Sequence, residues 1–148
     1  MSPSPTLQEQ ILRGGLIEAP VTERAQALQA ATDAGLAAWV VECDRARSRS
    51  AVLRAIAKAV DFPEFFGSSL DALYDCLSDT VIDQKAGLFL WFDRLHTGDP
   101  ILAEHAQAVL AVCNDVVEFA ENNERVFAYG IEHAGKHDDP EVEPESGL

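Results

Sequence analysis

A run of acidic residues between positions 61 and 83 has the residue types and spacing of a surface that binds cations. This segment, DFPEFFGSSLDALYDCLSDTVID, contains six acids and no basic residue. On a helix that starts near Ser69, residues Asp71 and Asp75 lie one turn apart, and so do Asp75 and Asp79. Like charges at this spacing repel each other by roughly 0.2–0.5 kcal/mol per pair on an exposed helix. No lysine or arginine in the segment relieves that repulsion.

Two interpretations of this acidic face stay open from the residues alone: a binding surface and a solvated helix face. Asp71 is explained by the helix dipole, which stabilises an acid in the first turn. That explanation does not reach Asp75 and Asp79, which are a turn or more further along. We expect Tyr74 and Ser78 on the same exposed or flanking side, and tyrosine is enriched at protein–protein interfaces.

The sequence contains no recognisable catalytic motif. The chain has no glycine-rich phosphate loop, no GxSxG motif and no CxxC pair. His96 and His105 have no nucleophile close in sequence, and Gly135 separates His133 from His137, whose four-residue spacing would otherwise suit a metal on a helix. We therefore expect no catalytic residue, no metal site and no cofactor.

The charge of the whole chain indicates the sign of its partner. Over 148 residues, enough for one compact domain, the formal net charge is -14. Residues 1–60 contain seven basic and six acidic residues, whereas residues 61–148 contain four basic and nineteen acidic ones. This field repels nucleic acid and anionic membranes and attracts cationic proteins, although acidic surfaces also serve solubility alone.

The sequence also suggests a compartment. No stretch approaches the roughly 20 apolar residues of a membrane span, and the first residues lack the basic and apolar regions of a secretory signal. The three cysteines, Cys43, Cys76 and Cys113, are odd in number and widely spaced. We interpret them as reduced thiols of a cytoplasmic protein.

The elements that must position the acidic face alternate between helix and strand. After an irregular lead-in to about residue 20, apolar periodicity and capping residues predict helices near 22–34, 48–61, 69–82 and 101–122. Short apolar runs predict buried strands near 36–43, 86–93 and 125–131. Such alternation favours an α/β fold with a small three-stranded parallel sheet flanked by helices. Residues 1–36 then form a partly helical extension, and residues 133–148 a disordered acidic tail.

One segment resembles a known family. Residues 63–77, PEFFGSSLDALYDCL, resemble the barstar signature, in which a proline and two aromatics precede a glycine and a helix reading LDALWDCL. The order of elements agrees over roughly residues 37–132, which we take as a barstar-like domain. The resemblance implies a non-enzymatic inhibitor that blocks the active site of a basic ribonuclease inside the producing bacterial cell.

Several residues acquire expected roles from this resemblance. Asp75 would be the central carboxylate that replaces substrate phosphate among the cationic groups of the ribonuclease, and Asp71 would be a second acid. On the long helix, Asp115 falls where the family carries an interface glutamate. Tyr74 stands where the family has a tryptophan, and Phe65 where it has a tyrosine.

Three further positions depart from the family pattern in ways that change the shape of the patch. Ser69 replaces an asparagine, Asp79 a glycine, and Thr80 falls near a position where the family has another tryptophan. Two alternatives therefore remain. One is an adaptor of this fold for another basic protein. The other is a metal-dependent phosphoesterase that uses Asp71, Asp75 and Asp115, because oxygen-rich clusters suit Mg²⁺.

Overall fold

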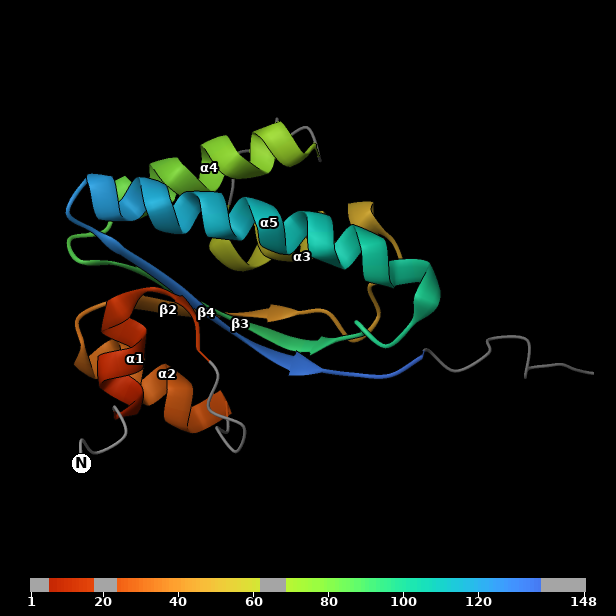
Figure 1. Cartoon of the computed structure of the whole chain (residues 1–148), viewed down its shortest axis with the longest axis horizontal. Helices are drawn as coiled ribbons and strands as arrows, with labels where there is room; N and C mark the ends of the chain where they lie inside the picture. Colours follow the sequence, from red (N-terminus) through yellow and green to blue (C-terminus); the bar gives the residue numbers. More distant parts are fainter. Residues whose placement is uncertain (1–5, 18–23, 62–68, 137–148) are drawn as a thin grey trace, which may run out of the picture.

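The computed structural model describes residues 6–17, 24–61 and 69–136. They form an α/β fold whose helices cover both faces of one parallel sheet (Figure 1). In chain order the elements are α1 (Leu7–Arg13), β1 (Gly15–Leu16), α2 (Arg24–Asp33), β2 (Ala37–Glu42), α3 (Arg49–Val60), α4 (Leu70–Asp83), β3 (Gly87–Leu95), α5 (Pro100–Asn122) and β4 (Val126–His133).

The sheet has four strands in the order β1-β4-β3-β2, and all the pairings are parallel. Strand β3 lies between β2 and β4. Its Leu88 is in register with Ala37 of β2, and its Gly87 is in register with Val126 of β4. Its first six residues are all buried, as the continuous apolar run GLFLWF requires of a strand covered on both faces. The three strands predicted from the sequence are therefore present.

The fourth strand corrects the prediction. Residues 7–16, expected to be irregular, form α1 and β1, and β1 pairs with the outer edge of β4. A two-residue strand has no periodicity from which it could be recognised. Helix α1 did carry a signal, because Thr6 and Glu9 form a reciprocal capping box at its start.

The side chains of β3 alternate between two cores. Leu88, Leu90 and Phe92 pack in the larger core, beneath α3, α4 and α5. Phe89 and Trp91 pack on the other face in a smaller core with buried residues of the N-terminal extension: Ile11, Ile17, Ala27, Ala31 and Leu36. The extension thus covers the sheet face opposite α4 and α5 (Figure 1).

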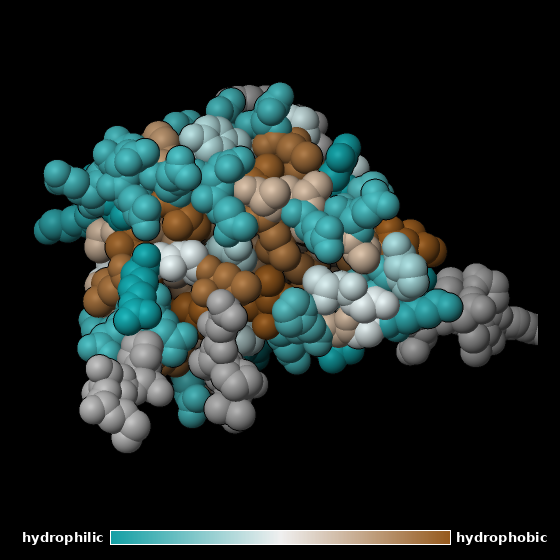
Figure 2. All heavy atoms as spheres, in the orientation of Figure 1, coloured by the Kyte–Doolittle hydropathy of each residue, from teal (hydrophilic) through white to brown (hydrophobic). Residues whose placement is uncertain are grey.

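The outer surface differs in polarity along the molecule. In the orientation of Figure 1, mainly hydrophilic residues gather where α4 and α5 end (Figure 2). Among the described residues, none of the helices has the length and apolar character needed to cross a membrane.

Candidate functional site

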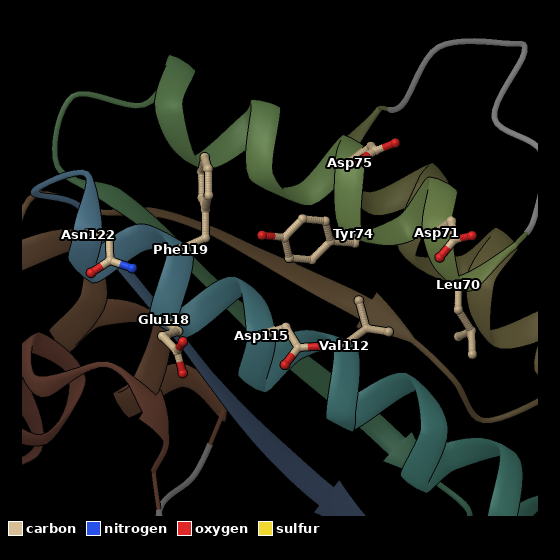
Figure 3. Close-up of a pocket in the computed structure, with 9 residues that line it drawn as sticks. All are labelled: Leu70, Asp71, Tyr74, Asp75, Val112, Asp115, Glu118, Phe119 and Asn122. Atoms are coloured by element: carbon tan, nitrogen blue, oxygen red, sulfur yellow. The ribbon is translucent and has the colours of Figure 1, made fainter.

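An open groove of about 700 Å³ runs between α4 and α5 (Figure 3). Asp71 and Asp75 from α4 and Asp115 from α5, three of the predicted site residues, line it together. The complete lining is Leu70, Asp71, Tyr74, Asp75, Val112, Asp115, Glu118, Phe119 and Asn122. The groove therefore brings together residues more than 30 positions apart in the sequence.

Helix α4 presents its acids because its apolar row turns inward. Ser69 caps the helix, its hydroxyl oxygen accepting a hydrogen bond of 3.0 Å from the backbone N–H of Ala72. Leu73, Leu77 and Val81 are fully buried against the core. Asp71 and Asp75 are exposed along the flank of the helix, with Asp75 at the rim of the groove (Figure 3).

Helix α5 supplies the opposite wall. Cys113, Val116 and Ala120 are fully buried at helical spacing, which leaves Asp115 and Glu118 exposed on the side that lines the groove. Sequence reasoning identified Asp115 from the resemblance but missed Glu118, Phe119 and Asn122. The one available signal was that residues 101–124 contain five acids and no lysine or arginine.

Tyr74 lines the groove beside the acids but is only partly exposed, and Ser78, expected on the exposed or flanking side, is buried. Tyr74 is half-buried between the helices, and its ring meets that of Phe119 edge to face, with centroids 6.3 Å apart and an interplanar angle of 75°. Ser78 is buried, and its hydroxyl has no hydrogen-bond partner among the described residues. The physical reason is that α4 is covered on two sides, by the sheet and by α5, so it buries a second row beside the leucines.

The remaining predicted residues contribute less directly to the groove. Asp79 is exposed one turn beyond Asp75 and does not line the groove. Thr80 is partly buried and donates a hydrogen bond of 2.8 Å to the carbonyl of Cys76. Phe65 lies outside the described residues.

The carboxylates of the groove lack a compensating cation among the residues that the structure describes. Within the described part of the chain, neither ion pairs nor hydrogen bonds join the side chains of Asp71, Asp75, Asp115 or Glu118 to other residues. Helices α4 and α5 contain no lysine or arginine. The acids also affect a neighbouring thiol. The pKa of Cys76 is raised mainly by burial and further by the charges of Asp79 and Asp75.

The described acids of the groove do not form a cluster of metal ligands. Among the residues that the structure places, no group of three or more histidine, cysteine, aspartate or glutamate side chains could hold a metal ion. The geometry therefore gives no support to the metal-dependent alternative, which needs Asp71, Asp75 and Asp115 around one ion. What the groove offers is a preformed anionic surface with an aromatic floor, the arrangement that complements a cationic protein cleft.

Comparisons with known proteins agree with this fold. Residues 36–132 match the family described as Barstar (barnase inhibitor). A comparison with curated proteins gave no match. One similar solved structure is described as "Structure of the Aeropyrum Pernix ORC2 protein (ADPNP-ADP complexes)", with a TM-score of 0.53 and 18% identity. That similarity concerns the fold alone, because it covers 84% of this chain but only 35% of the other. The family match spans well over half of the chain, and the protein is therefore a member of the barstar family.

Proposed function

We propose that the protein inhibits a basic ribonuclease by placing the groove between α4 and α5 over the enzyme's active site. The observation that carries the proposal is the set of four uncompensated carboxylates on two facing helices, within a barstar domain. A ribonuclease cleft that binds phosphates presents cations, and Asp75 at the groove rim would take the place of a phosphate among them. The rigid helices hold these acids before the partner arrives, which lowers the ordering cost of binding.

The groove also supports an adaptor function for another cationic protein. Tyr74 is half-buried against Phe119, so the aromatic surface lies at the bottom of the groove instead of projecting from α4. A partner must therefore insert a side chain between the helices to reach it. The depth of the groove therefore selects a partner by its shape, whereas the carboxylates select it only by its charge.

The test is inhibition of a basic ribonuclease from the same source, measured with the wild-type protein, Asp75→Asn and Asp79→Asn. Both substitutions remove one exposed carboxylate from α4, but only Asp75 lines the groove. We expect Asp75→Asn to weaken binding by about 30-fold or more, the effect of losing a hot-spot contact of about 2 kcal/mol. Asp79→Asn should change it by less than about fivefold, as a peripheral charge does.

Two results would count against the proposal. One is full ribonuclease activity in the presence of a large excess of the wild-type protein, and the other is equal weakening by both substitutions. Binding partners captured from the native cell then separate the two functions. Loss of a ribonuclease with Asp75→Asn supports the inhibitor, and loss of an unrelated basic protein supports the adaptor.

A further inference from the structure

A basic surface lies away from the acidic groove. Residues 45–60 contain five cations and no acid, and removing these five from the net charge of -14 leaves -19 on the rest of the chain. All five side chains are exposed: Arg45, Arg47, Arg49, Arg54 and Lys58. Arg54 and Lys58 lie one turn apart on α3, on the side opposite its buried residues Val52, Leu53, Ile56 and Val60. We call these five cations the α3 basic face.

The described chain ends close to where this face begins. Strands β2, β3 and β4 are parallel, so the chain leaves β2 and β4 at the same edge of the sheet. His96 links the segment after β4 to the segment after β2. One of its ring nitrogens hydrogen-bonds to the carbonyl of Gly135, and the other lies 3.1 Å from Oδ1 of Asp44. Asp44 immediately precedes Arg45. One imidazole ring thus spans from the end of the described chain to the start of the basic face.

The segment beyond this exit has matching charge and sufficient length. Residues 137–148, HDDPEVEPESGL, contain five acids and no lysine or arginine. An extended chain spans at most about 3.3–3.6 Å per residue, so these residues can reach roughly 40 Å. Helix α3 has 12 residues and is about 18 Å long at 1.5 Å per residue.

We infer that the acidic segment 137–148 of the chain docks on the α3 basic face, held by charge rather than by fixed contacts. The five acids of the segment offset the positive charge of this face. The segment thereby masks the positive surface that would repel a cationic partner. The remaining exposed charge of the molecule is then predominantly negative and includes the groove between α4 and α5.

The three lysines of the chain allow a direct test by zero-length carbodiimide crosslinking of the full-length protein. Lys58 is on the basic face, whereas Lys85 lies between α4 and β3, at the opposite edge of the sheet. Arg54→Lys adds a second amine to the face without changing its charge. At low salt we expect the acids of residues 138–145 to form crosslinks with the amines at positions 54 and 58 in the purified monomer. We expect no crosslink to Lys85.

Salt and a charge-neutral control complete the experiment. At about 1 M salt the Debye length falls to about 3 Å, so the crosslinks to positions 54 and 58 should disappear. In the variant D138N/D139N/E141Q/E143Q/E145Q, the amide NMR signals of α3 should shift relative to wild type at low salt but coincide with them at high salt. Crosslinks to Lys85 as frequent as those to Lys58, or α3 signals unaffected by the neutral variant, would overturn the inference.

Discussion

At the scale of single residues, the ends of β3 and β4 bring two carboxylates together. Hydrogen bonding to Asp93, then burial and the charge of Asp93, raise the pKa of Glu132, while Arg94 opposes the shift. A raised folded-state pKa means that the protonated acid stabilises the fold. This contribution is present below the unfolded pKa of Glu132 and is lost as the pH rises through the folded pKa.

Glu132→Gln should therefore raise the melting temperature at pH 7, because glutamine keeps a hydrogen-bond donor for Asp93 and carries no charge. The gain should shrink as the pH falls toward about 4, where the wild-type side chain is itself protonated. Thermal denaturation of both proteins at the two pH values measures this. Glu121→Gln, which removes an exposed carboxylate from α5, provides the control for charge alone. A lower melting temperature of Glu132→Gln at pH 7 would refute the assignment.

At the scale of elements, the groove depends on α4 and α5 being placed side by side on β3 and β4. Gly87 begins β3 with φ +136°, and an added Cβ would lie 1.9 Å from the carbonyl oxygen of Val126 on β4. Any other residue must therefore separate the central strands where the chain enters β3. Gly35 also has a positive φ of +89°, but its nearest neighbour to an added Cβ is Ala86 at 3.8 Å.

We expect Gly87→Ala to lower the free energy of unfolding by about 3 kcal/mol or more, because backbone strain and a steric clash act together. Gly35→Ala should cost only about 1–2 kcal/mol, from the left-handed backbone conformation alone. Urea denaturation midpoints compare the two variants with wild type. Equal losses of stability in the two variants would show that the close approach of Val126 does not require a glycine at position 87.

At the scale of the whole molecule, the charge is divided between a basic α3 face and an acidic groove. The net charge of -14 attracts cationic proteins before contact, and the ribonuclease proposed as partner would be one of them. The association rate of the complex should fall about 10-fold or more between low and physiological ionic strength, while the dissociation rate changes less. Stopped-flow mixing over a salt series measures both rates. An association rate independent of salt would contradict electrostatic steering.

Much of the site could be predicted from local sequence because it depends on helix geometry. The Ser69 cap, the leucine row and the one-turn spacing of Asp71 and Asp75 are properties of a single helix, and the structure confirms them. The parallel arrangement of β2, β3 and β4 followed from their alternation with helices. Signals of this kind are contained within 10–20 residues and need no knowledge of distant neighbours.

Tertiary structure alone decided which flank of α4 is covered and what faces it. The sequence of α4 could not show that Tyr74 packs against Phe119 of α5, or that Glu118 would complete the groove, because these contacts join segments far apart in the chain. Nor could it reveal that the extension adds β1 to the edge of β4. The sequence by itself determined the acidic helix, its cap and the sign of its charge. The packing of α5 against α4 turned that helix face into a groove, because only a second surface can enclose a volume.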